Sequence, residues 1–347
     1  MSQKKSSADK DKRKRRTCDE FNPKTVNKFG FSSSSHDNSP CSSSLNTTLT
    51  RERERKWFEM LKNWDHLMTS SYDKVRVRCR KGIPHSLRAA VWRALCGAAN
   101  LQQKNPGMFE DLLRKESQWM VYIEKDLPRT YKLHELFAEE GGLGQTEMKK
   151  VLKAYSIYNP KVGYCQGMTS IAGILLMLMP AEQAFWCLVA IMNKYLPGYF
   201  SDGLLAVQLD GRVMESLVND IDPKISAFLR RNDVQATFYA VEWFLCAYTR
   251  TLPWETVLRI WDMFLCEGVK VLIKTGVTLL MLAFSDKKVR DVCDSFDKAL
   301  KYLKYRLPDQ LLEEDFFVNE LLSLHISEEQ LKETHLAQLA KLQDIYR

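Results

Sequence analysis

Residues 167–179 read GMTSIAGILLMLM, a nearly unbroken apolar stretch in a chain of 347 residues, and Pro180 follows it. The longest apolar runs, at 171–179 and 184–192, have nine residues each, whereas a bilayer span needs about 20. A helix that is apolar on every side is typical of a protein interior. The sequence therefore predicts that 167–179 forms a buried central helix of a folded domain and does not span a membrane.

Helical periodicity continues on both sides of this stretch. Apolar residues recur at spacings of three and four from Met148 to Tyr155. Further helices are expected at roughly 181–195, 204–220, 223–231, 235–250, 254–266, 269–284 and 287–305. The chain has 15 Gly and 11 Pro, fewer than turn-rich β folds usually carry. Residues 75–78 alternate apolar and polar, and we expect them to form a loop. Together these features predict an all-α fold.

Amphipathic helices are also expected at both ends of this region. Residues 51–75 repeat apolar side chains at the helical period from Trp57 to Met68, which predicts one helix leading into the domain. Residues 311–345 carry a similar period and predict two further helices. A Ser-x-x-Gln capping box that begins at Ser327 indicates where the second of them starts.

The first fifty residues differ in composition from the rest. They hold ten Lys or Arg, five Asp or Glu and 11 Ser, so +5 of the chain's net charge of +8 lies there. Such a segment has too little apolar surface to offset the entropy of ordering, and we expect residues 1–50 to be disordered. The densest basic run, at 12–16, fits a nuclear address, a contact with anionic lipid or a solvated tail.

Signatures of self-contained chemistry do not occur in the sequence. It has no G-x-x-x-x-G-K-[ST] loop, no C-x₅-R loop and no G-x-S-x-G elbow. The nine cysteines include no C-x-x-C pair, and the six histidines show no paired metal-ligand spacing. An odd number of scattered cysteines is typical of reduced thiols in the cytosol. We therefore expect a cytoplasmic protein with no metal site.

Two polar residues stand out from their surroundings. Arg129 follows the helix-breaking Pro128, and Gln166 lies directly before the apolar stretch 167–179. From spacing alone, Arg129 is expected to pair with a carboxylate such as Asp126, and Gln166 to cap the helix that follows. Spacing alone leaves a functional role for both residues open.

These residues belong to a set of four motifs in order along the chain. The motifs are Arg80-Lys81-Gly82-Ile83-Pro84 with Arg88 and Trp92; Ile123-x-x-Asp126-x-x-Arg129-Thr130 with His134 and Phe137; Gly163-Tyr164-Cys165-Gln166-Gly167-Met168; and Leu252-Pro253 with Arg259-Ile260-Trp261-Asp262, Phe264 and Gly268. Across residues 82–270 they resemble the TBC domain family, the activators of Rab GTPases. The residues around them resemble the subgroup that includes the ezrin-linked microvillar TBC proteins.

Two positions depart from the family pattern. Lys132 stands where many members have Pro, next to a motif but outside it. The subgroup's microvillar member binds a PDZ scaffold through its extreme C-terminus, and PDZ grooves bury an apolar final side chain. This chain ends in Arg347, which argues against a PDZ scaffold as a partner.

The resemblance implies an all-helical domain of two lobes that regulates vesicle trafficking. It would not be an enzyme with its own substrate site, because it supplies catalytic residues in trans to a GTP-bound Rab. Arg129 would be its arginine finger and Gln166 its glutamine finger. GTP and Mg²⁺ would be bound by the Rab, so the resemblance implies no cofactor on this chain. The alternative is a non-catalytic Rab-binding or scaffold module on the same fold.

Other motif residues are expected to have supporting roles. Asp126 is placed to orient Arg129, and Tyr164 either contacts the Rab or packs inside the domain. The expected structural residues are Arg88, Trp92, Arg259, Trp261 and Asp262, which hold helices together, and Gly82, Pro84 and Gly167, which shape the backbone.

The expected domain organisation follows from these assignments. It comprises the disordered basic tail at 1–50, the leading helix at 51–75, the Rab-GAP TBC domain at 76–310 and the C-terminal helices at 311–347. For the tail three roles stay open: contact with an anionic membrane surface, which would recruit a cytoplasmic protein peripherally, a nuclear address, or no targeting role. We expect no nucleic-acid partner.

Overall fold

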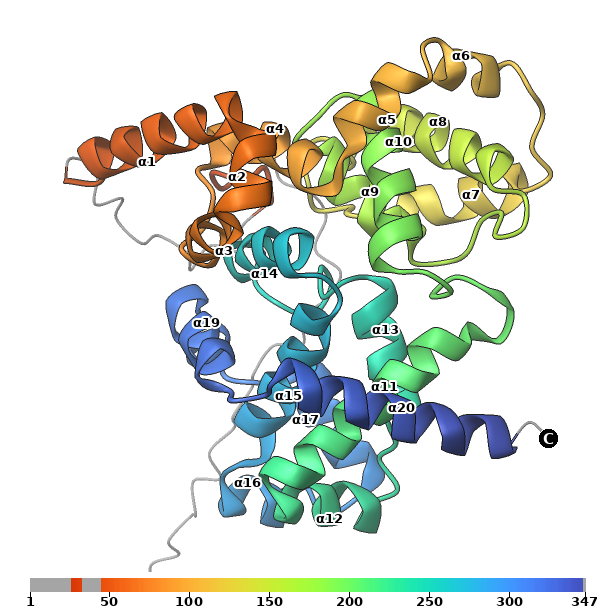
Figure 1. Cartoon of the computed structure of the whole chain (residues 1–347). Helices are drawn as coiled ribbons and strands as arrows, with labels where there is room; N and C mark the ends of the chain where they lie inside the picture. The colour runs from red at the N-terminus through yellow and green to blue at the C-terminus, as the bar shows by residue number, and fades with distance from the viewer. Residues whose placement is uncertain (1–25, 33–44, 346–347) are drawn as a thin grey trace, which may run out of the picture.

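Helices form all the regular secondary structure of the residues that the structure describes. The computed structural model describes residues 26–32 and 45–345, and outside helices this part contains two isolated β-bridges. The helices are α1 (Leu45–Lys62), α2 (Trp64–Ser70), α3 (Tyr72–Arg80), α4 (His85–Cys96), α5 (Ala98–Lys104), α6 (Met108–Leu113), α7 (Met120–Asp126), α8 (Leu143–Tyr158), α9 (Met168–Leu176), α10 (Ala181–Ala190), α11 (Leu205–Ile221), α12 (Pro223–Arg231), α13 (Ala240–Leu245), α14 (Trp254–Glu267), α15 (Lys270–Phe284), α16 (Lys287–Val292), α17 (Phe296–Tyr305), α18 (Asp309–Leu312), α19 (Glu314–Ser323) and α20 (Glu328–Ile345). The predicted all-α fold is confirmed (Figure 1).

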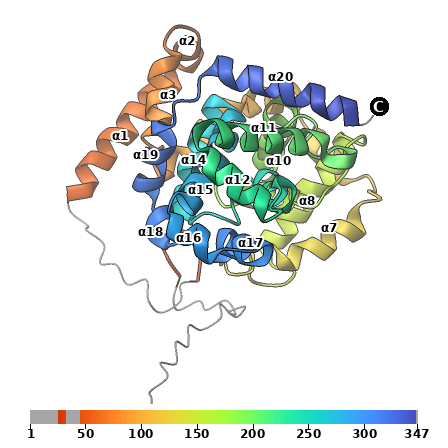
Figure 2. The ribbon, with the colours of Figure 1, turned by 90° about the horizontal axis from the view of Figure 1, so that it is seen from below.

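Two groups of helices pack around α9 and around α11. Helix α9, the predicted central helix, has all nine residues buried and packs against α8 and α10 in the group that also holds α5 to α7. In the second group α11 packs against α12, α13, α15 and α20 (Figure 1). Figure 2 shows α20 running across α11 at the edge of the molecule. Helix α14 contacts α3, α4, α15 and α19, and so joins the second group to the N-terminal helices.

The segment predicted as one helix at 51–75 is divided among three. Helix α1 ends at Lys62, and Asn63 and Ser71 leave the helical conformation on either side of α2. Short polar side chains favour such breaks because they compete for backbone hydrogen bonds. The buried positions Trp57 and Met60 still follow the predicted period.

The expectation of a loop at 75–78 is wrong, because these residues lie inside α3. Val75 and Cys79 are buried one helical turn apart, whereas Val77 is exposed. The apparent alternation therefore came from one exposed apolar residue, and the four-residue spacing from Val75 to Cys79 was the informative signal.

Two other predicted helices are interrupted. The stretch 235–250 contains a 3₁₀ turn at Ala236–Phe238 and the short α13, after which the chain enters a left-handed turn. The stretch 287–305 is split into α16 and α17 at residues 293–295. The capping box predicted at Ser327 is partly present, since the Gln330 amide donates to the Ser327 hydroxyl at 3.0 Å.

The structure describes two parts of the N-terminal segment, residues 26–32 and 45–50. The prediction of disorder through residue 50 does not hold for residues 26–32, which pack on the domain, or for 45–50, which begin α1. The basic run at 12–16 lies outside the described residues. In the described part of the chain, no helix is long and apolar enough to cross a bilayer.

Candidate functional site

Asp262 on α14 is the centre of the motif residues that hold helices together. Its side chain is completely buried and accepts hydrogen bonds from the Arg88 guanidinium at 3.0 and 3.1 Å and from the Trp92 indole at 2.7 Å. It also accepts from the Ile83 amide at 2.8 Å. One carboxylate thus joins α4, the turn before α4 and α14, as expected for a structural role.

The flanking motif residues extend this junction. The Trp92 and Trp261 rings stack with centroids 5.4 Å apart, and the Trp261 indole donates to the Ala247 carbonyl at 3.0 Å. Arg259 donates to the Arg80 carbonyl at 2.7 Å and pairs with Glu314 at 2.6 Å.

Gly82 and Pro84 shape the turn that leads from α3 into α4. Gly82 has φ +87°, and a Cβ there would lie 2.7 Å from the Arg259 side chain. Pro84 precedes the first turn of α4, and its carbonyl accepts from the Leu87 amide at 3.0 Å. Gly82 thus adopts a left-handed conformation that favours glycine, and Pro84 directly precedes α4.

Arg129 ends a 3₁₀ turn, Leu127–Arg129, that follows α7. Its guanidinium pairs with Asp126, as the spacing predicted, but 57% of the side chain remains exposed while Asp126 is 7% exposed. Asp126 in turn accepts a hydrogen bond from the Tyr164 hydroxyl. Burial, and then this hydrogen bond, raise the pKa of Tyr164 above its ordinary value, so the hydroxyl remains a donor. Tyr164 is buried and therefore packs inside the domain.

Gln166 lies in the turn before α9 and is exposed. The expected capping role is wrong: Gly167 occupies the N-cap position, and α9 has no side-chain cap. Gly167 has φ +105°, which a side chain at that position would disfavour. Within the described residues, no hydrogen bond holds the side-chain amide of Gln166, so this group can both donate to and accept from a bound group.

Arg129 and Gln166 line the same cleft, a cavity of about 610 Å³. The same cavity is also lined by Leu204, by residues of α13 and by the turn after α13, including Glu242 and Arg250. A guanidinium and an unpaired amide in one water-accessible cavity can stabilise a charged group and orient a small polar molecule. The sequence motifs include Asp126, Arg129 and Gln166 of this lining but not Leu204, Glu242 or Arg250.

Tyr131 couples the two predicted finger residues. It follows the Arg129 turn at φ +50°, and its hydroxyl donates to the Ser170 carbonyl on α9 at 2.8 Å. Its ring packs against Gly173, one turn further along α9. The turn that carries Arg129 is therefore fixed to α9, which begins two residues after Gln166.

The N-terminal segment 26–32 braces the loop that follows this turn. The Ser32 amide donates to the Leu133 carbonyl, and the Glu135 amide to the Gly30 carbonyl, each at 2.8 Å. The Phe31 ring contacts His134 and Trp254 at centroid distances of 4.7 and 4.9 Å, and lies 6.3 Å from Tyr131. Sequence analysis missed this contact, although Phe29 and Phe31 are conspicuous aromatics in a polar segment.

Replacing Phe31 by Ala is expected to loosen this brace. Removing a half-buried ring should cost about 1–2 kcal/mol locally, less than the 3–5 kcal/mol typical of a fully buried Phe. The Glu135 amide should then exchange with solvent roughly 5- to 30-fold faster in native-state hydrogen exchange. Phe58→Ala is the matched control, because Phe58 is exposed on α1. Unchanged protection of Glu135 in the Phe31 variant would contradict a bracing role.

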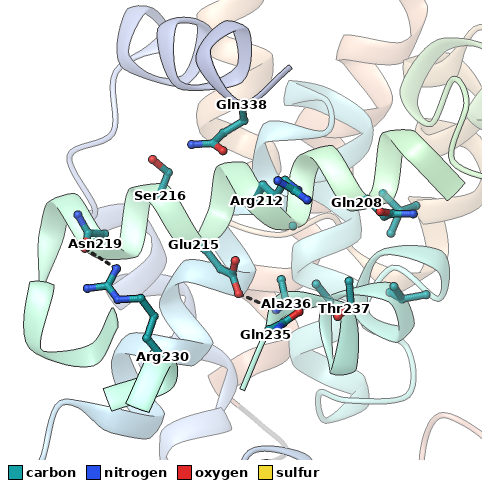
Figure 3. A pocket seen from close by; sticks show the side chains of 14 residues that line it. Gln208, Arg212, Glu215, Ser216, Asn219, Arg230, Gln235, Ala236, Thr237 and Gln338 are labelled. Carbon is teal, nitrogen blue, oxygen red and sulfur yellow. Dashed lines mark hydrogen bonds between the residues drawn. The ribbon is translucent and has the colours of Figure 1, made fainter. Parts of the chain in front are cut away.

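A second cavity, of about 430 Å³, lies between α11, the turn after α12 and α20 (Figure 3). Its charged groups are largely held by neighbours. Glu215 accepts from the Ala236 amide at 2.6 Å, and Arg230 donates to the Asn219 side chain at 3.4 Å. None of the motif residues lines it. The larger cleft, which Arg129 and Gln166 line, is therefore the stronger candidate site.

Comparison with known proteins identifies similar sequences and structures. The Rab-GTPase-TBC domain family profile matches residues 85–288. The chain is 44% identical over 318 residues to TBC1 domain family member 10B of Mus musculus, covering 91% of this chain and 40% of that protein. It is 42% identical over 326 residues to TBC1 domain family member 10A of Mus musculus, covering 93% and 65% respectively.

A solved structure has the same fold. The crystal structure of the Chlamydomonas flagellar RabGAP TBC domain superposes with a TM-score of 0.67 at 24% identity, covering 85% of this chain and 98% of that one. The chain thus matches nearly the whole of that domain, whereas it spans about 40% of the length of TBC1 domain family member 10B.

Proposed function

The chain belongs to the Rab-GTPase-TBC domain family, and on that premise we propose that it accelerates GTP hydrolysis by a Rab GTPase docked at the cleft. One observation carries the proposal: a single cavity of about 610 Å³ is lined by the exposed side chains of Arg129 and Gln166. The chain would supply both groups in trans and would have no substrate site of its own.

Arg129 would stabilise charge on the transferring phosphoryl group. Phosphoryl transfer spreads negative charge over the γ-phosphate oxygens and the leaving oxygen, and a planar guanidinium can direct several N–H groups at them. An arginine finger accelerates hydrolysis by about 10³- to 10⁵-fold, which corresponds to roughly 4–7 kcal/mol of barrier. The buried Asp126, itself held by Tyr164, would orient the guanidinium, while 57% of the Arg129 side chain remains exposed.

Gln166 would position the attacking water. Its carbonyl oxygen can accept a hydrogen bond from the water while its NH₂ group donates to the phosphate, which places the water in line with the bond that breaks. The turn at Gly167 and the attachment of Tyr131 to α9 support the proposal, because they fix the Gln166 backbone relative to Arg129.

The remaining components would come from the partner and the membrane. GTP and Mg²⁺ would be bound by the Rab, so we propose no cofactor on this chain. Peripheral recruitment of a cytoplasmic protein to an anionic membrane would depend on the basic run at 12–16.

A panel of GTP-loaded Rab GTPases tests the proposal. Single-turnover hydrolysis is measured for each Rab with and without the full chain, and we expect stimulation of at least about 10³-fold for one or more of them. Tight binding of a GTP-loaded Rab with an unchanged hydrolysis rate would instead indicate a non-catalytic binding module on the same fold. That result would overturn the proposed function.

A further inference from the structure

A second arginine lines the cleft that holds Arg129 and Gln166. Arg250 lies in the turn between α13 and α14 and lines the same cavity as Arg129 and Gln166. Its side chain is 58% exposed, and its Nε lies 3.5 Å from a carboxylate oxygen of Glu242. None of the sequence motifs includes this residue.

The backbone before Arg250 is held in an unusual conformation. Ala247 and Tyr248 are consecutive non-glycine residues with φ +43° and +62°. Such residues cost about 1–3 kcal/mol each and persist where the surrounding structure fixes them, often at functional sites. Here the Ala247 carbonyl accepts from the Trp261 indole at 3.0 Å, and the Tyr248 hydroxyl donates to the Leu272 carbonyl at 2.8 Å.

This turn leaves Arg250 as the first exposed residue after a buried run. Residues 243–249 are all buried, and the Thr249 hydroxyl donates to the Cys246 carbonyl at 2.9 Å. Trp261, which stacks on Trp92, therefore also anchors the turn that carries Arg250.

The charges around Arg250 leave it available for a new partner. Glu242 lies between two cations, with Arg250 at 3.5 Å and Lys304 of α17 at 3.8 Å. An exposed ion pair of this kind contributes about 0–1 kcal/mol, so Arg250 can leave it at little cost while Lys304 stays beside Glu242. Arg129, in contrast, is paired with a buried carboxylate.

We propose that Arg250 binds a carboxylate of the docked GTPase and so sets the affinity of the complex, not the rate of the chemical step. The inference rests on the proposed function, because it requires a GTPase in the cleft. A guanidinium can bind a carboxylate through two parallel N–H groups. In the free chain Arg250 is already paired with a carboxylate, that of Glu242. Arg250 would exchange Glu242 for the partner's acidic side chain when the complex forms.

Steady-state kinetics with a Rab that the wild-type chain stimulates test this inference. Arg250→Ala should raise KM about tenfold and leave kcat unchanged, because the lost contact is made equally in the ground and transition states. Arg250→Lys should recover part of the affinity. Glu242→Gln should lower KM about two- to fivefold, since it releases Arg250 from its resting partner. Arg114→Ala, an exposed arginine outside the cleft, should change neither parameter.

Binding measurements separate a carboxylate from the reacting phosphates as the ligand of Arg250. Arg250→Ala should weaken binding of the GTP-loaded Rab and of the Rab with GDP and aluminium fluoride by the same factor. Arg129→Ala should weaken mainly the second complex, which mimics the transition state. An Arg250 variant that lowers kcat at unchanged KM, or that weakens only the aluminium fluoride complex, would overturn the inference.

The outcomes for the two proposals are distinguishable. Stimulation by the wild-type chain with an unchanged KM in Arg250→Ala would contradict this inference alone. Lack of stimulation for every Rab would contradict the proposed function and this inference with it. Because Arg250 is exposed, its variants should melt at the wild-type temperature, and thermal denaturation checks this.

Discussion

Replacing Arg129 by Lys is expected to abolish most of the stimulated hydrolysis, lowering the single-turnover rate by about 10³- to 10⁵-fold. Lys keeps the positive charge but concentrates it at one nitrogen, so it cannot direct several N–H groups at the phosphoryl oxygens. Arg129→Ala should have a similar effect. The Rab used should be one that the wild-type chain stimulates, and the measured quantity is the rate at saturating chain.

Two features of the structure make this variant informative. The Arg129 side chain is mostly exposed, so its replacement should leave the fold intact, and thermal denaturation serves as the check. Affinity for the GTP-loaded Rab should change little, because the interaction is made in the transition state. Wild-type stimulation by Arg129→Ala would show that the guanidinium plays no catalytic role.

Replacing Asp262 by Ala should have the largest effect on stability, lowering the free energy of unfolding by about 3–5 kcal/mol. The substitution leaves the Arg88 guanidinium, which is 8% exposed, without its counter-charge. It also removes the acceptor for the Trp92 indole and the Ile83 amide. Urea unfolding followed by tryptophan fluorescence measures the change.

Two further variants keep this prediction testable even if Asp262→Ala does not fold. Trp92→Phe removes one hydrogen bond to Asp262 and keeps an aromatic ring, so it should cost about 1–2 kcal/mol. Asp73→Asn breaks a surface pair with Arg76 and should cost less than about 1 kcal/mol. Equal stabilities of the Asp262 and Asp73 variants would contradict a structural role for the Asp262 network.

The sequence predicted the elements that depend on local periodicity. The apolar stretch at 167–179 indicated the central helix α9, because a helix that is apolar on every side can be assigned to the interior without knowing which elements pack against it. Periodicity failed where a polar residue breaks a helix without Gly or Pro, as at Asn63 and Ser71. It also failed at Val75, where an exposed valine two residues later imitated a strand.

Of the candidate site, the sequence predicted the contacts between residues close in sequence but not the cleft. The pairing of Arg129 with Asp126 follows from a three-residue spacing, but the cleft depends on contacts between residues distant in sequence. Resemblance to the family pointed to Arg129 and Gln166, which the structure places in one cavity. Arg250 shows no such signal, because its exposure depends on a left-handed turn anchored by Trp261 and Leu272.

The segment 26–32 illustrates the limit of composition. Its polar surroundings predicted disorder, yet two backbone hydrogen bonds and the Phe31 ring hold it against the loop after Arg129. Composition averages over a window and cannot register two aromatic residues that find a complementary surface elsewhere in the chain.

The central claim, that this chain supplies both finger residues, is tested most directly with a responsive Rab whose own water-orienting Gln is replaced by Ala. If Gln166 positions the water, the wild-type chain will still stimulate single-turnover hydrolysis by this Rab, and Gln166→Ala will lower the rate by about 10²-fold or more. Loss of stimulation with the Rab variant, together with full activity of Gln166→Ala on the unmodified Rab, would assign the catalytic glutamine to the GTPase and contradict the account.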